Sequence, residues 1–596
     1  MDLALVPGLV LLVIASSIAR APQDGDAAGE PGPFCPPPDL ALLVSPSGGL
    51  RDLVERFETD HRTLRRFFDA SFSTARRAEE MRMMELWLGA LDAIDFDALD
   101  ADARIDYVLL RNRLRYELRR LEIDAAERDE TLALVPFGDA IVELQEARRR
   151  LEPGDPARAA ELLVELAESI EPLKERLRRG LGDEEERASD GLVVEPTVAN
   201  RAASEVRELR RVLESWFSYH DGYDPVFSWW LRAPYGALSE ALDGYASFLR
   251  EEIVGVDEDD ADTIIGDPIG RDALLVELEN AMIPYTPEEL MAIAEREFAW
   301  CERERLRASN DLGFGDDWRA ALEHVKGLHV GPGEQPELIR QLAFEAVDFL
   351  EANELLTIPE LAKRSWRMEM MSPERQKYTP YFTGGEVISV SFPTDGMDHA
   401  DKRMSMRGNN VHFSRATVHH ELIPGHHLQQ FMNARHRSYR RAFWTPFWTE
   451  GWALYWEMLL WDEGFPGSPE DRMGMLFWRS HRCARILFSL GFHLGELTPA
   501  ECIELLTERV GHELKNATAE VRRSVQGGYG PLYQCAYMVG GLQFRSLHAE
   551  LVGGGRLSNR AFHDAVLREG PIPVEMVRAK LTGEELTRER ASRWRF

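Results

Sequence analysis

Apolar residues recur at three- and four-residue intervals through most of the chain, and this spacing places them on one face of an α-helix. The pattern is clearest over residues 50–130 and 157–216, and helical segments are again expected from residue 288 and from residue 413 onward. Residues 378–393 instead combine β-branched and aromatic residues around a Gly-Gly pair, which predicts a hairpin or an edge strand. We therefore expect a mainly α, multi-helix fold with one small β element.

The chain has 596 residues, which is enough for two helical lobes. An apolar run near the start ends in a small-x-small pattern, so residues 1–21 are expected to be a signal peptide. A retained anchor and a cytoplasmic protein are the alternatives to export. Residues 22–45 are rich in Pro and Gly and predict a linker. The expected lobes are residues 46–280 and residues 281–596, and no membrane insertion is expected beyond the N-terminal segment.

The charge balance excludes some classes of partner. Lys and Arg number 70 and Asp and Glu number 102, which gives a formal net charge of −32. A chain this acidic is repelled by nucleic acid and by anionic lipid surfaces. The five cysteines include no CxxC pair, so a cysteine zinc site and a small disulfide scaffold are excluded, although one disulfide remains possible in an exported protein.

The residues with the clearest chemical potential lie between positions 411 and 430, where five of the 16 histidines occur. The His420-Glu421 pair resembles the start of a zincin HExxH motif, in which two histidines four residues apart share one helix face. Here the next histidine, His426, is six residues away and about 120° off that face of a regular helix. We expect Pro424-Gly425 to break the helix and bring the two imidazoles together.

A third ligand is expected from residues 444–461, an apolar and aromatic segment whose acids are Glu450 and Glu457. A carboxylate in such surroundings must be paired or bind a metal. Catalytic zinc sites often use two histidines and one acid. We expect Glu450 to be the ligand, close to a helix start capped by Thr449, and Glu457 to orient a histidine or sit at the solvent edge of the helix. His419 and His427 are further candidates, either to orient a ligand or to bind the metal in place of one of these residues.

These motifs carry a family resemblance. HELIPGHH at 420–427, TEGWALYWE at 449–457 and an Ala-Tyr-x-x-Gly element at 536–540 resemble the bacterial domain-of-unknown-function 885 family, which is in turn similar to the gluzincin metallopeptidases. The resemblance extends over roughly residues 45–590. It implies a largely helical, two-lobed fold with a deep substrate channel, and it makes residues 281–596 the catalytic lobe.

The resemblance also implies roles for individual residues. It gives His420, His426 and Glu450 as ligands of one Zn²⁺, Glu421 as the general base, and Tyr537 as a hydrogen-bond donor to the developing oxyanion. Zinc is preferred from the ligand types, with other divalent metals as alternatives. Ser489 replaces an acid of the family pattern, while the nearby His493 is retained as a residue that contacts the substrate or the oxyanion.

The expected function is zinc-dependent hydrolysis of peptide bonds, with a peptide or peptide-like substrate. A metal-dependent amidase acting on a non-peptide substrate would use the same residues. A catalytically silent binding protein is a further alternative, although a purely structural zinc site has no need of Glu421 as a base. A serine hydrolase is disfavoured because Gly-x-Ser-x-Gly does not occur.

Overall fold

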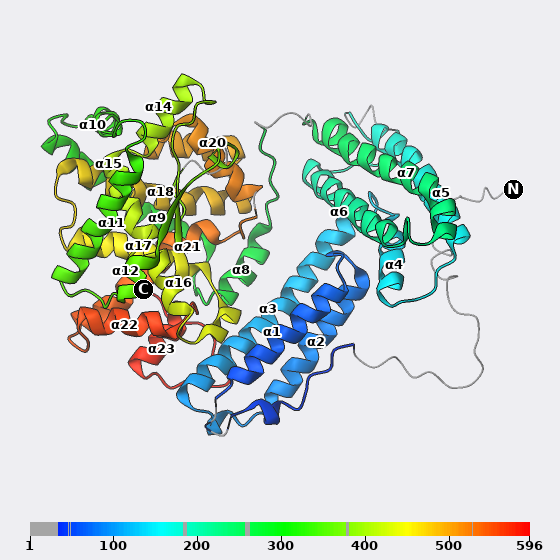
Figure 1. Ribbon diagram of the computed structural model, residues 1–596, viewed down its shortest axis with the longest axis horizontal. Helices are drawn as coiled ribbons and strands as arrows, with labels where there is room; N and C mark the ends of the chain where they lie inside the picture. The colour runs from blue at the N-terminus through cyan, green and yellow to red at the C-terminus, as the bar shows by residue number, and fades with distance from the viewer. Residues whose placement is uncertain are drawn as a thin grey trace. The chain divides into compact units, whose positions relative to one another are not determined.

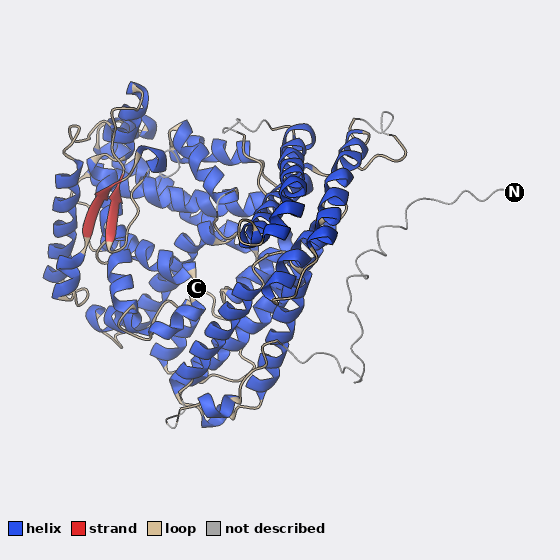
Figure 2. Ribbon diagram, turned by 45° about the vertical axis from the view of Figure 1, so that its right-hand side comes forward, coloured by secondary structure: helices blue, strands red, loops and turns tan. Residues whose placement is uncertain are grey.

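The structure is a computed structural model, and it confirms the mainly α fold (Figures 1 and 2). The expected signal peptide and much of the linker lie outside the described residues. The structure describes residues 34–45, 47, 49–182, 188–256, 263–376, 381–526 and 528–596. Within them, no helix has both the length and the apolar content needed to cross a membrane.

The first half of the chain contains long helices joined by short turns. In chain order the elements are η1 (Leu40–Leu43), α1 (Arg51–Phe67), α2 (Thr74–Asp92), η2 (Phe96–Ala98), α3 (Ala101–Thr131), α4 (Gly138–Arg149), α5 (Pro156–Arg178), α6 (Pro196–His220), α7 (Pro225–Phe248) and η3 (Leu249–Val254).

The second half adds shorter helices and the two strands. The elements are α8 (Gly270–Asn280), α9 (Pro287–Asp311), α10 (Trp318–Lys326), α11 (Gln335–Ala352), α12 (Glu360–Ser365), β1 (Arg367–Met370), α13 (Pro373–Gln376), β2 (Val387–Val390), α14 (His399–Gly408), α15 (Val411–Glu421), α16 (His426–Asn433), η4 (Ser438–Phe443), α17 (Pro446–Asp462), α18 (Pro469–His493), α19 (Pro499–Leu505), η5 (Leu506–Val510), α20 (Leu514–Val525), α21 (Tyr533–His548), η6 (Ala549–Gly553), α22 (Asn559–Glu569) and α23 (Val574–Thr582).

Helix starts follow the sequence signals closely. At α9, Thr286 accepts a hydrogen bond from the backbone of Glu289, whose side chain in turn accepts from the backbone of Thr286. This capping box satisfies two backbone donors that a helix start leaves unpaired. Pro287 stands at the first helical position, where its missing N–H costs nothing.

The chain forms two compact units, and the division differs from the expected boundary near residue 280. One unit comprises Met1–Pro38, Thr59–Ala90 and Leu121–Thr263, and the other comprises Asp39–Glu58, Leu91–Arg120 and Ile264–Phe596. Helix α8 belongs to the second unit because Leu274 and Leu278 are buried in that unit's core.

Each unit has its own apolar core. In the first unit, buried residues of α4, α5, α6 and α7 pack together, with Leu209, Leu213 and Leu238 fully buried. In the second, the core is built by α9, α17, α18 and α21 (Figure 1). Each of the four helices contributes several buried apolar residues to this core.

The extended segment forms a smaller sheet than expected. Strand β2 pairs in parallel with β1, in a register that places Met368 opposite Ile388, and the two strands are the red ribbons of Figure 2. Thr383 and Ser389 also form an antiparallel bridge, a remnant of the expected hairpin. Residues 377–380 lie outside the described part of the chain. Ser389 is therefore paired on both sides, with Glu369 of β1 and with Thr383.

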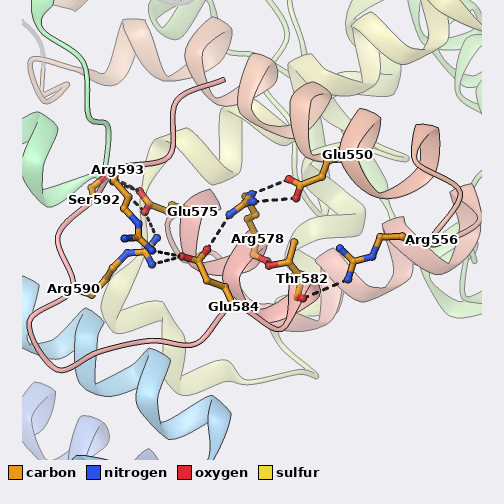
Figure 3. Close-up of polar contacts among 9 residues, drawn as sticks. All are labelled: Glu550, Arg556, Glu575, Arg578, Thr582, Glu584, Arg590, Ser592 and Arg593. Atoms are coloured by element: carbon orange, nitrogen blue, oxygen red, sulfur yellow. Dashed lines mark hydrogen bonds and ion pairs between the residues drawn. The ribbon is translucent and has the colours of Figure 1, made fainter.

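Ion pairs hold the segment after α23 against the rest of the second unit (Figure 3). Buried Glu575 accepts hydrogen bonds from Arg590, from Ser592 and from the backbone N–H of Arg593. Arg578 donates two bonds to Glu550 and one to Glu584. These guanidinium groups line a surface hollow, but glutamates engage them, so their role is structural.

Candidate metal centre

The two histidines of the expected metal site lie on either side of a helix break. Helix α15 is capped at its start by the Asn410 side chain and ends at Glu421, and α16 begins at His426. The Ile423-Pro424 peptide bond is cis. A Cβ atom on Gly425 would lie 1.7 Å from the carbonyl oxygen of His420, so only glycine fits there. The break expected at Pro424-Gly425 is therefore present.

The break brings one nitrogen of each histidine to the same carboxylate. His420 Nε2 lies 3.5 Å and His426 Nε2 lies 3.2 Å from Glu450 Oε2. All three side chains are buried, and their donor atoms lie within 4.8 Å of one another. A tetrahedral zinc ion with bonds of roughly 2.0–2.1 Å needs donor atoms about 3.4 Å apart, so this spacing suits zinc.

Glu450 lies in the first two turns of α17. The cap of this helix is Thr445, whose side chain accepts from the Phe447 N–H, and not the expected Thr449. Tyr533 donates a hydrogen bond to Glu450 Oε1, whereas the buried Oε2 faces the two imidazole nitrogens. A buried carboxylate oxygen between two imidazoles fits a metal ligand. Burial opposes the charge of Glu450, but His426 and His420 outweigh it and hold its pKa well below the usual range.

Glu457 lies two turns further along α17 and orients the first histidine. Its Oε1 is 2.7 Å from His420 Nδ1 and 3.5 Å from a guanidinium nitrogen of Arg482. A proton on Nδ1 that is donated to Glu457 leaves the lone pair of Nε2 free for a metal. Burial disfavours a charged His420, but Glu450 and Glu457 prevail and raise its pKa to about 9.

Glu421, the expected base, is the last residue of α15 and is half-buried. Gly384-Gly385 passes directly over it: a Cβ on Gly384 would lie 2.4 Å from Glu421 Oε2, and the Gly385 N–H donates to the Glu421 carbonyl at 3.2 Å. Burial raises the pKa of Glu421, although the nearby His426 and His420 oppose this effect. A carboxylate with a raised pKa beside a metal is a stronger proton acceptor than an exposed one.

Tyr537, on α21, packs flat against His420 with ring centroids 6.1 Å apart and an interplanar angle of 17°. The guanidinium carbons of Arg482 and Arg485 lie 5.0 and 4.4 Å from its ring centroid. Burial raises the pKa of the Tyr537 phenol, so its hydroxyl stays protonated at neutral pH. The structure thus places this tyrosine beside the candidate ligand His420.

Three further candidates lie apart from the ligand atoms. His419 packs against the Phe465 ring, and burial lowers its pKa to about 4. His427 Nε2 is 2.8 Å from the carbonyl oxygen of Ala362. His493 ends α18, eleven residues and about 16 Å along the helix from Arg482. Burial lowers its pKa to about 4 as well.

Several residues that complete the centre were not predicted from sequence. Tyr533 holds Glu450, and Arg482 holds Glu457. Gln429 donates to the Thr449 carbonyl at 2.6 Å, and Trp452 Nε1 donates to the Pro424 carbonyl at 2.8 Å. The spacing of Tyr533 and Tyr537, four residues apart on one helix face, was the available signal for the first of them.

Comparison with known proteins identifies the family. A family model described as "Bacterial protein of unknown function (DUF885)" matches residues 66–581. The chain belongs to this family. The DUF885 match includes α15, α16, α17 and α21, so all four helices that carry the candidate centre lie within it.

Two solved structures share the fold of this DUF885 member. "A putative lipoprotein of unknown function from Shewanella oneidensis" aligns over 89% of this chain and 99% of its own, with a TM-score of 0.64 and 14% identity. "The putative lipoprotein from Colwellia psychrerythraea" aligns over 90% of this chain and 99% of its own, with a TM-score of 0.55 and 15% identity. No curated protein sequence matches the chain.

Proposed function

We propose that this protein is a zinc-dependent hydrolase of peptide bonds, similar in chemistry to the gluzincins. One observation carries the proposal: a potential ligand atom from each of His420, His426 and Glu450 lies within 4.8 Å of the other two, and Glu421 directly follows His420 in the chain. Two imidazoles and one carboxylate leave one position of a tetrahedral zinc ion open for water or substrate.

We assign a separate role in the reaction to each residue around this site. Bound zinc would supply an acidified water molecule and polarise the scissile carbonyl. Glu421 accepts the proton of the attacking water and returns it to the leaving amine. Tyr537 stays protonated and donates to the carbonyl oxygen as negative charge develops there. Glu457 and Tyr533 fix the orientation of His420 and Glu450.

The replacement Glu421→Gln tests this assignment. We expect the variant to bind one equivalent of zinc, because Glu421 is not a ligand, and to lose at least about 100-fold in kcat, since general-base catalysis contributes about 10²–10⁴-fold. Metal content and hydrolysis of a mixed peptide library should be measured together. Asp462→Asn, at an exposed position of α17, is the surface control. Undiminished hydrolysis by Glu421→Gln would contradict the proposed role of Glu421 as the general base.

We also propose that the protein is exported. The two structural neighbours are both described as lipoproteins, and residues 3–18 of this chain form an apolar run. Fractionation of cells that express the full chain checks this. Recovery of the protein with cytoplasmic markers alone would contradict export.

A further inference from the structure

A group of arginines surrounds the tyrosines of the candidate centre. Arg482 and Arg485 come from α18 and lie over the ring of Tyr537. Arg523 comes from α20, with its guanidinium carbon 5.5 Å from the ring centroid of Tyr529. We call these three residues the arginine cluster. Its members come from two helices, α18 and α20.

The arginine cluster has fewer acids than bases. Glu457 pairs with Arg482, and Glu520 accepts from both Arg485, at 2.7 Å, and Arg523, at 2.7 Å. In the described part of the chain, Glu520 is the carboxylate paired with both Arg485 and Arg523, so these two guanidinium groups share one carboxylate. A buried surplus of positive charge attracts an anion.

Each arginine also retains an unused donor. Arg482 Nε, Arg485 Nη1 and Arg523 Nε are buried and have no hydrogen-bond partner among the residues that the structure describes. Buried donors are normally satisfied, and three in one place indicate a bond that a ligand completes. Guanidinium groups bind carboxylates with two parallel hydrogen bonds, which favours this class of anion.

The arginine cluster is reachable from the surface through Arg523, whose side chain is 21% exposed. Tyr529, beside it, is 36% exposed. The Tyr529 and Tyr533 rings are 4.4 Å apart, and Tyr533 donates to the ligand Glu450. An anion bound at Arg523 is therefore separated from the proposed metal ligand Glu450 by the rings of Tyr529 and Tyr533.

We propose that Arg523, with Arg485 behind it, binds the free α-carboxylate of a peptide substrate, so that the enzyme removes residues from the C-terminal end of peptides. The inference rests on the proposed peptide-bond hydrolysis and specifies its substrate class. Glu520 is a positioning residue, because it holds both guanidinium groups and also accepts from Gln534 at 3.1 Å.

Two peptides that differ only at the C-terminus test the proposal. Both are N-acetylated alanine pentapeptides extended by phenylalanine, one ending in a carboxylate and the other in a carboxamide. We expect the zinc-loaded wild-type protein to release phenylalanine from the first, with a kcat/KM at least about 100-fold above that for the second. Equal hydrolysis of both peptides overturns the inference and leaves the proposed function intact.

Variants of Arg523 make the test specific to this residue. In Arg523→Gln, kcat/KM for the carboxylate peptide should fall about 100-fold, with the carboxamide peptide unchanged, and Arg523→Lys should recover part of the loss. Lys515→Gln removes an exposed charge from the same helix and is the matched control. An equal fall for both peptides in Arg523→Gln overturns the inference.

A binding measurement separates this inference from the proposed function. If the wild-type protein cleaves neither peptide, calorimetric titration of both peptides into zinc-loaded Glu421→Gln decides the question. Tighter binding of the carboxylate peptide by about 100-fold supports the carboxylate site even though hydrolysis has failed. Equal affinity for the two peptides overturns it.

Discussion

Tyr533 shows how much the position of one ligand depends on a single hydroxyl. It donates to Glu450 Oε1 and leaves Oε2 directed at the two histidines. In Tyr533→Phe the carboxylate loses this support, and we expect zinc affinity to fall about 10–100-fold, as for other groups that orient metal ligands. Competition with a fluorescent chelator measures it. Tyr219→Phe, exposed on α6, is the control, and unchanged affinity in Tyr533→Phe would contradict the role.

At this same scale, the sequence indicated the candidate ligands and one of their supports, Glu457, but not Tyr533 or Arg482. His420, His426 and Glu450 could be predicted because each lies in a short segment of distinctive composition. Tyr533 follows Glu450 by 83 residues, and only the packing of α17 on α21 brings them together. The cap of α17 was misplaced for a local reason. Thr445 and Thr449 both lie shortly before Glu450, so either could have capped the helix. In the structure it is Thr445 that accepts a hydrogen bond from a backbone N–H at the helix start, that of Phe447.

At the scale of elements, two glycines set the distance between α17 and α21. A Cβ on Gly540 would lie 2.0 Å from the Phe447 carbonyl oxygen and 2.8 Å from the Cα of Gly451. Gly540→Ala must push the helices apart, and we expect a loss of about 1–3 kcal/mol in the free energy of unfolding. Because Glu450 and Tyr533 lie on these two helices, zinc affinity should fall as well.

Urea unfolding of the variant measures the stability loss. The control is Gly244→Ala in α7, where nothing lies within 4 Å of the added carbon. There alanine should be neutral or stabilising, by about 0.5–1 kcal/mol, because it restricts the unfolded chain and suits a helix. Equal stability of Gly540→Ala and the wild type would show that the close approach is dispensable.

Helix periodicity predicted the elements well because most of the chain is amphipathic and has clear caps, as at Thr286 and Pro287. The two-stranded sheet was harder to predict from the sequence. β2 has the expected β-branched residues, but its partner β1 reads Arg-Met-Glu-Met and is largely exposed, so its sequence carries no strand signal. Pairing with a neighbouring strand, and not local preference, makes β1 extended.

At the scale of the whole molecule, metal binding should stabilise the second unit. Zinc that binds the folded unit and not the unfolded chain adds about 2.7 kcal/mol when its free concentration is 100 times Kd. Calorimetric scans with a chelator, and again after zinc is restored, should show the transition of the second unit moving to higher temperature with zinc. In His426→Ala that shift should vanish. Identical transitions with and without zinc in the wild-type protein would contradict a metal site in this unit.

The ligands and their supports come from α15, α16, α17, α18 and α21, and they are spread over more than a hundred residues of chain. In a partly folded chain, His420, His426 and Glu450 are not yet held close together, because they lie on three different helices. Full affinity is therefore acquired only as the helices of the second unit assemble, and capture of the ion is among the last events of maturation. Two imidazoles and a carboxylate accept several divalent ions, with copper ahead of zinc in intrinsic preference. If the proposed site takes up an ion, the metals present in the compartment where folding is completed decide which ion that is.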